Sequence, residues 1–253
     1  MDPASTISTP LPLKGARNTR DLGGYAYRAV DGTRGVTASG AFLRSGSLTR
    51  LRTADREFLR AYGLTRVVDI RSDFEVRHWP DPYSRRPESG VGYAHIPMLD
   101  QLNSSGFRGA LPECMFDVYR DLLDDSASSI RRVFEALDTD GCALFHCRAG
   151  KDRTGVIAML LLGLAGVSDD DIVADYVATQ RYMGHGLGIQ RAAASVAILK
   201  PVPRCLFEAA PHEMERALAH LHGTYGTARD YLERAAGCPR PLLDRIEARL
   251  QGR

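Results

Sequence analysis

Short apolar stretches alternate with amphipathic ones along this chain, and each kind predicts a different element. Three stretches rich in β-branched and apolar residues predict strands at residues 65–70, 91–98 and 142–146. Apolar positions at helical spacing predict helices at residues 53–62, 115–123, 128–137, 168–182, 211–222, 227–236 and 241–250. Residues 154–165 are apolar on nearly every face, so they should form a buried central helix.

Turn and capping residues mark further elements. An Asp31-Gly32 turn signal, with an apolar return at residues 41–43, predicts a small hairpin over residues 23–43. Ser72 and Glu75 have the spacing of a capping box, which should open a short helix. Two stretches rich in Pro, Gly, Ser or charge should lack regular structure: residues 80–90 form a loop, and residues 100–112 form a loop or a lid.

The order of these elements predicts an α/β fold. Strands separated by helices form a central, mostly parallel sheet flanked by helices, here with an N-terminal hairpin and a helical C-terminal extension. No internal repeat and no long linker divides the chain, so residues 14–253 should form a single domain. Residues 1–13 contain Pro, Ser and Thr with little apolar pattern and should be a flexible tail.

Composition narrows the function classes. A formal net charge of +2 argues against a nucleic-acid binder that relies on phosphate contacts. The five cysteines fit neither a zinc site nor a disulfide framework, so free thiols and no metal are expected. The N-terminus lacks the features of a secretory signal, and residues 156–164 are too short to span a bilayer. A cytoplasmic location without a transmembrane segment follows.

Candidate chemistry lies between the strand at residues 142–146 and the central helix. The sequence Cys147-Arg148-Ala149-Gly150-Lys151-Asp152-Arg153 places a cysteine at a strand end, just before a helix N-terminus. Backbone N–H groups and the helix dipole favour the thiolate there, which is the nucleophilic form of cysteine. The N–H groups from Arg148 to Arg153 can curl into a nest around a phosphate dianion. The Arg153 guanidinium can grip two phosphate oxygens in a fork.

The neighbouring residue types suit the same chemistry. Ala149 and Gly150 let the backbone approach a phosphate closely. Thr154, at the helix start, can donate a hydrogen bond to the sulfur and assist its departure as a leaving group. His146 can orient the loop and support the thiolate. We therefore predict phosphomonoester hydrolysis through a phosphocysteine intermediate, with no cofactor and with inorganic phosphate as product.

Residues 146–155 resemble the signature loop of the protein tyrosine phosphatase superfamily. More narrowly, the chain is similar to the bacterial protein tyrosine phosphatase family that includes mycobacterial protein tyrosine phosphatase B. The similarity covers roughly residues 14–237, and four segments carry it in the same order: residues 18–25, 43–46, 67–72 and 150–155. It implies a Cys-dependent phosphatase domain and phosphotyrosine protein substrates, sometimes phosphoserine, phosphothreonine or phosphoinositides, and it leaves open export without a signal peptide.

Three aspartates compete for the role of general acid. Trp79-Pro80-Asp81 resembles the acid loop of large eukaryotic tyrosine phosphatases, but it precedes the strand at 91–98, which the acid loop should follow. It should be a Pro-bounded surface loop. Asp100 follows that strand, as the acid of dual-specificity phosphatases does. Asp152 resembles the loop aspartate of myotubularin-type lipid phosphatases and needs no loop closure, so we prefer it over the alternative, Asp100.

Lys151 has two interpretations. Gly-Lys-x-Arg resembles the loop of phosphatases that act on inositol lipids, where the lysine adds a charge for a second phosphate. Alternatively, Lys151 is a solvated loop residue. Asp69 and Arg71 should form an internal ion pair that fixes loops. Asn18, Arg20 and Asp21, in the N-terminal part of the resemblance, should be scaffold.

Three other functions compete with protein tyrosine phosphatase activity. A phosphoinositide phosphatase would use the same loop. An inactive module that only binds phosphorylated ligands would have lost Cys147 or Arg153, and both are present. A rhodanese-type or arsenate-reductase-type enzyme would lack the Arg-Thr-Gly end of the loop and the block at residues 18–24.

Overall fold

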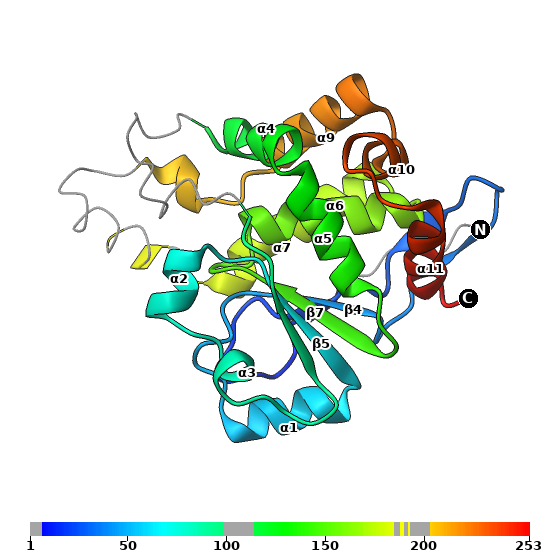
Figure 1. The fold of residues 1–253 in the computed structure, drawn as a ribbon. Coiled ribbons are helices and arrows are strands. Elements are labelled where there is room, and N and C mark those ends of the chain that lie inside the picture. The colour runs from blue at the N-terminus through cyan, green and yellow to red at the C-terminus, as the bar shows by residue number, and fades with distance from the viewer. Residues whose placement is uncertain (1–6, 99–113, 185–187, 190–191, 193–202) are drawn as a thin grey trace.

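A five-stranded sheet organises the molecule (Figure 1). The computed structural model describes residues 7–98, 114–184, 188–189, 192 and 203–253. In spatial order the strands are β1 (Arg20–Asp21), β4 (Phe42–Ser45), β7 (Cys142–His146), β5 (Leu64–Asp69) and β6 (Gly92–His95). The last four run parallel, and only β1 is antiparallel to its neighbour. The predicted α/β fold with a mostly parallel sheet is confirmed.

Both faces of the sheet are covered by a hydrophobic core. Side chains of a strand alternate between the two faces, so one strand can contribute to both cores. In β7, Ala143 and Phe145 belong to the larger core, whereas Cys142 and Leu144 belong to the smaller one. Such strands read as continuous apolar runs, as those of parallel sheets do.

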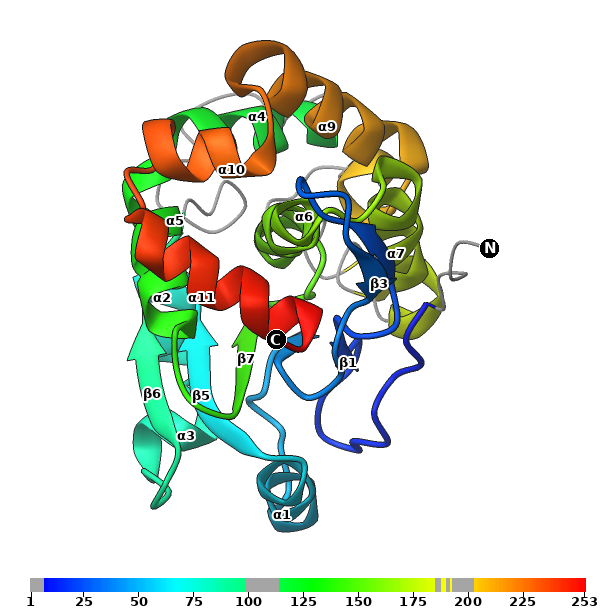
Figure 2. The same ribbon diagram turned by 90° about the vertical axis from the view of Figure 1, so that its right-hand side faces the viewer.

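Helices enclose these two cores. Their bounds are α1 (Thr53–Ala61), α2 (Asp73–His78), α3 (Pro82–Arg85), α4 (Met115–Asp125), α5 (Ala127–Leu137), α6 (Asp152–Ala165), α7 (Asp169–Met183), η1 (Arg204–Phe207), α9 (Pro211–Tyr225), α10 (Ala228–Asp230), η2 (Tyr231–Ala235) and α11 (Arg240–Gln251). Figure 2 shows α6 end-on, and it packs against α4, α7, α10 and α11 as the predicted central helix. The smaller core lies under α1 and α3. Residues 80–90, which we predicted to be only loop, thus contain the short helix α3.

The predicted N-terminal hairpin is present, but its second strand differs. β2 (Ala26–Arg28) pairs with β3 (Arg34–Val36), which the sequence analysis did not predict. The predicted return at residues 41–43 belongs instead to β4, which pairs with β7 in the main sheet. Buried apolar side chains decide this, because Phe42 and Leu43 are fully buried whereas Val36 is 42% exposed.

Three parallel strands end side by side. Ser45 of β4 and Asp69 of β5 both stand opposite His146 of β7 in the register. The segments that follow these strands therefore meet at one edge, where α/β folds bind ligands.

The predicted division into a tail at residues 1–13 and one domain at residues 14–253 stays a prediction. Within the described part of that tail, the Leu11 amide donates to the Thr19 carbonyl oxygen at 2.8 Å. Leu11 and Leu13 are half-buried against the smaller core.

Among the described residues, none of the helices combines the length and the apolar character that crossing a bilayer requires.

Candidate active site

The loop after β7 is held from outside through its carbonyl groups. The Asn18 side-chain amide donates to the carbonyl oxygens of Ala149 and Gly150 at 3.1 and 2.9 Å. Arg44 Nη2 also donates to Gly150 O, at 2.8 Å. Because the C=O and N–H groups of a trans peptide point in opposite directions, the next N–H groups turn toward the inside of the loop. This is the arrangement of an anion nest.

Gly150 is a position that only glycine fits. Its φ is +69°, and an added Cβ would lie 2.6 Å from the carbonyl carbon of Ser45. The Gly150 amide donates to Cys147 Sγ at 3.3 Å, so the loop curls back over the sulfur. Ser47 N donates to Arg148 O at 2.9 Å and closes the other side. Cys147 is 2% exposed.

A buried ion-pair network supports the residues that hold the loop. Asp175 of α7 accepts from Arg20 Nε at 2.7 Å, from Tyr25 at 2.9 Å and from Arg44. Burial by itself would raise the pKa of Asp175, but Arg20 and Arg44 outweigh burial and lower it to about 2. Asn18 and Arg20 are thus scaffold, as predicted, and the network fixes Arg44 against Gly150.

Replacing Asp175 with Asn should lower the free energy of unfolding by about 3–5 kcal/mol at neutral pH, because two buried guanidinium groups lose their counter-ion. The folded pKa is lowered, so this contribution is present above the unfolded value of about 3.9. It is lost as pH falls toward about 2. The free energies of unfolding of the wild type and the variant, measured in urea, should therefore differ at pH 7 and approach each other as the pH falls. Asp140→Asn, at an exposed position, is the control; an equal Asp175→Asn deficit at every pH would contradict the assignment.

Arg153, at the start of α6, forms a fork with a carboxylate. Its Nη1 and Nη2 donate to the two oxygens of Glu75 at 2.7 and 3.2 Å. Glu75 also accepts from Ser72 N at 3.0 Å in the capping box that opens α2. We predicted that cap from the sequence, but not the contact of Glu75 with Arg153. The cap fixes Glu75, and Glu75 fixes the Arg153 guanidinium.

His146 lies beneath the loop in a second buried cluster. Its Nδ1 is 3.1 Å from Cys147 O, and its Nε2 lies 3.1 Å from Asp81 Oδ2 and 3.7 Å from Asp69 Oδ2. Burial would lower the pKa of His146, but Asp69 and Asp81 raise it. The side-chain ligand atoms of Asp69, Asp81 and His146 lie within 4.8 Å of one another, so two carboxylates face the imidazole beneath the loop.

This cluster corrects our interpretation of Trp79-Pro80-Asp81. Asp81 is fully buried, not part of a surface loop, and its Oδ1 accepts from Tyr83 N at 2.7 Å as the cap of α3. The Trp79 carbonyl accepts from Arg71 Nη1 at 2.8 Å. The predicted Asp69–Arg71 ion pair is confirmed, at 2.6 Å. The segment thus supports the loop from below.

Asp152, the preferred general acid, is the first residue of α6 and its side chain is 21% exposed. Tyr119 of α4 donates to Asp152 Oδ1 at 2.8 Å, and the Tyr119 and Tyr176 hydroxyls are 2.6 Å apart. Burial, reinforced by Asp152, raises the pKa of Tyr119, so its hydroxyl stays a donor. No local sequence signal connects Tyr119 to Asp152. The alternative acid, Asp100, lies outside the described residues.

Lys151 is neither solvated nor directed to a second phosphate. It is 1% exposed, and its ammonium donates to the carbonyl oxygens of Leu206 and Glu208 at 2.9 and 3.0 Å. Asp152 Oδ1 lies 3.3 Å from the same ammonium. The Lys151 side chain therefore ties η1 to the loop. Within the described part of the chain, the buried Thr154 hydroxyl has no hydrogen-bond partner, so it does not donate to the sulfur in this structure.

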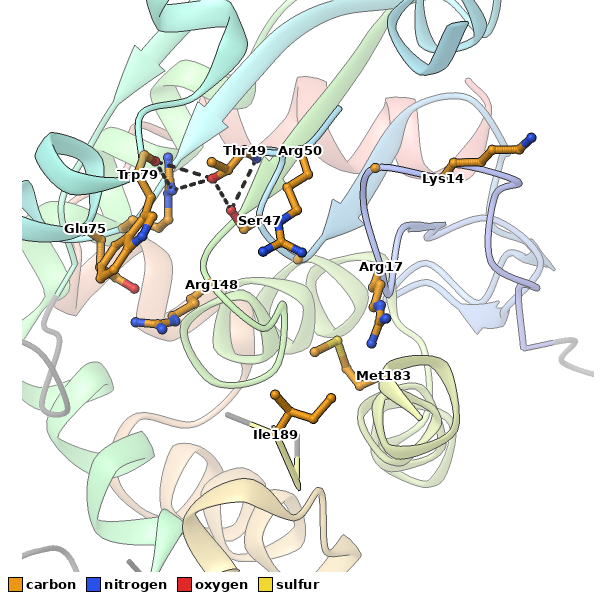
Figure 3. A pocket seen from close by; sticks show the side chains of 13 residues that line it. Lys14, Arg17, Ser47, Thr49, Arg50, Glu75, Trp79, Arg148, Met183 and Ile189 are labelled. Atoms are coloured by element: carbon orange, nitrogen blue, oxygen red, sulfur yellow. Dashed lines mark hydrogen bonds between the residues drawn. The ribbon is translucent and has the colours of Figure 1, made fainter. Parts of the chain in front are cut away.

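A cavity of about 430 Å³ opens beside the loop (Figure 3). Arg148 borders it on one side, with its guanidinium carbon 4.9 Å from the centre of the Trp79 ring. Figure 3 shows Arg17 and Arg50 ending in the same opening on the other side. Gly46 and Ser47, which follow β4, connect the two sides. The cavity is thus bordered by cations where it meets the loop.

Comparisons with known proteins identify relatives of this chain. The sequence model of the tyrosine phosphatase family matches residues 11–252. A tyrosine-protein phosphatase of Nostoc commune is 32% identical over 220 residues, which cover 83% of this chain and 74% of that protein. The triple specificity protein phosphatase PtpB of Mycobacterium tuberculosis is 31% identical over 187 residues, 61% of this chain and 66% of that protein. The crystal structure of P. aeruginosa TpbA has a TM-score of 0.38 and 16% identity, over 82% of this chain and 94% of that chain.

Proposed function

This chain belongs to the tyrosine phosphatase family, and we propose that it dephosphorylates phosphotyrosine in proteins through a cysteinyl-phosphate intermediate. Its substrate is a phosphorylated protein and its product inorganic phosphate. One observation carries the mechanism. The carbonyl groups of Ala149 and Gly150 are bonded on the outside of a loop that begins at Cys147 and ends at Arg153.

In the first step, the Cys147 thiolate attacks phosphorus and the bond from phosphorus to the phenolic oxygen breaks. Backbone N–H groups of Arg148, Ala149, Gly150 and Lys151 hold the phosphoryl oxygens, together with the Arg153 N–H groups that do not bond to Glu75 and the N-terminal end of the α6 dipole. These donors are in place before the reaction, so little reorganisation is needed.

Asp152 gives its proton to the departing phenolate oxygen. In the second step, water attacks phosphorus, Asp152 accepts the proton of that water, and the sulfur–phosphorus bond breaks to restore the thiolate. Thr154, whose buried hydroxyl has no partner among the described residues, donates a hydrogen bond to the departing sulfur. Tyr119 and Lys151 keep the Asp152 carboxylate in position through both steps.

Phosphoserine and phosphothreonine are included as secondary substrates, because the loop binds the phosphoryl group without contacting the rest of the residue. Phosphoinositides remain the alternative substrate. The Lys151 ammonium does not favour a lipid with a second phosphate, since it is engaged by two carbonyl groups.

A side-by-side assay tests the proposal. Matched peptides with phosphotyrosine or phosphoserine and a short-chain phosphoinositide are compared by kcat/KM in the presence of a chelator. We expect the phosphotyrosine peptide to be the best substrate and the chelator to have no effect. A higher kcat/KM for the phosphoinositide would overturn the assignment to proteins, and binding of all three without hydrolysis would identify an inactive binding module.

A further inference from the structure

The cavity beside the loop carries positive charge that the proposed chemistry does not use. Lys14, Arg17, Arg50 and Arg148 line it and form no ion pairs with other described residues. The carboxylate in the lining, Glu75, is already bonded to Arg153. An unpaired cluster of cations in a concave site attracts an anionic ligand group.

Arg17 and Arg50 are held next to the loop by their backbones. Gly46 N donates to Arg17 O at 3.0 Å, and a Cβ on Gly46 would lie 3.3 Å from Ala149 O. A Cβ on Gly15 would lie 2.1 Å from Arg50 O, so the two segments are in direct contact. Both side chains are exposed and reach the opening in Figure 3, whereas Lys14 extends away from it.

Resting on the proposed function, we propose that Arg17 and Arg50 form a subsite for a carboxylate close to the phosphotyrosine of a protein substrate. The enzyme then prefers phosphotyrosine flanked by Asp or Glu. Trp79, Met183 and Ile189 line the rest of the cavity and give it apolar surface for the neighbouring peptide side chains.

A peptide explains this lining better than a lipid headgroup does. Lys151, which the resemblance to lipid phosphatases suggested for the second phosphate of a headgroup, is buried and its ammonium is bonded to two carbonyl oxygens. Arg17 and Arg50 come from two separate segments, and the cavity between them and Arg148 also offers apolar surface. An extended chain with alternating side chains uses all of these features.

The test compares kcat/KM for two phosphotyrosine peptides that differ only by Glu or Gln at the flanking positions. Exposed ion pairs are weak, so two of them should give the wild type about a three- to tenfold preference for the Glu peptide. The variant Arg17→Gln/Arg50→Gln should lose this preference. Its activity on p-nitrophenyl phosphate, which has no flanking residues, should stay unchanged and so report that it folds. Arg132→Gln, which removes one exposed positive charge on α5, should behave as wild type.

A second measurement needs no variant. Raising the salt concentration from about 0.1 to about 1 M shortens the Debye length from about 10 to about 3 Å, so the preference of the wild type for Glu should shrink.

Several outcomes would overturn the subsite. One is a Glu preference retained by the double variant, and another is a preference insensitive to salt. If the double variant loses kcat/KM only for a bisphosphorylated phosphoinositide and keeps the preference for the Glu peptide, the arginines bind a lipid headgroup instead. In contrast, a wild type that does not hydrolyse p-nitrophenyl phosphate would overturn the proposed function itself.

Discussion

Replacing Cys147 with Ser should reduce turnover of p-nitrophenyl phosphate and of a phosphotyrosine peptide by about 10⁴-fold or more, as expected for loss of a nucleophile. A serine hydroxyl stays protonated at neutral pH where a thiolate is needed. Binding of the phosphotyrosine peptide should persist, because the carbonyl contacts that shape the loop come from Asn18 and Arg44 and do not involve the sulfur. Calorimetric titration of the variant with the peptide measures that affinity.

A matched control separates the nucleophile from a general effect of losing a thiol. Cys238 is also buried, and burial raises its pKa to about 11, so it stays a protonated thiol outside the loop. Cys238→Ser should keep its activity in the folded fraction of the protein. Turnover that survives Cys147→Ser would rule out the cysteinyl-phosphate mechanism.

Replacing Asp152 with Asn should reduce kcat/KM for a phosphotyrosine peptide by about 10²–10⁴-fold, the range of general acid catalysis. An activated aryl phosphate has a leaving group that departs without a proton, so its loss should be far smaller. The ratio of the two losses is the measurement, because a change in folding alone would lower both rates equally.

Two further variants sharpen this test. Tyr119→Phe keeps the ring and removes the hydrogen bond to Asp152. It should give a weaker loss with the same dependence on the leaving group, as a positioning residue would. Asp100→Asn should leave that dependence unchanged. If Asp100→Asn instead shows the selective loss and Asp152→Asn does not, the general acid is Asp100.

The part of the candidate site that is contiguous in the sequence could be predicted from the sequence. The proposed nucleophile Cys147, the proposed phosphate nest and Arg153 lie within one strand-to-helix turn, and local geometry alone brings such residues together. The Asp69–Arg71 ion pair was also predicted, because the two residues are neighbours at a strand end. Residue types and spacing are sufficient wherever the interacting groups are this close in sequence.

The chain by itself thus determined the α/β order of elements, the phosphate loop and the helix behind it. Only the tertiary structure decided which distant side chains hold that loop: Glu75 on Arg153, Asp81 beside His146, and Tyr119 on Asp152. The strand order is the physical reason. With β5 next to β7, the segments after β5 come to lie against the loop, which buries an Asp81 that its Pro-rich neighbours suggested was exposed. Spacing along a sequence carries no information about such neighbours until the sheet has formed.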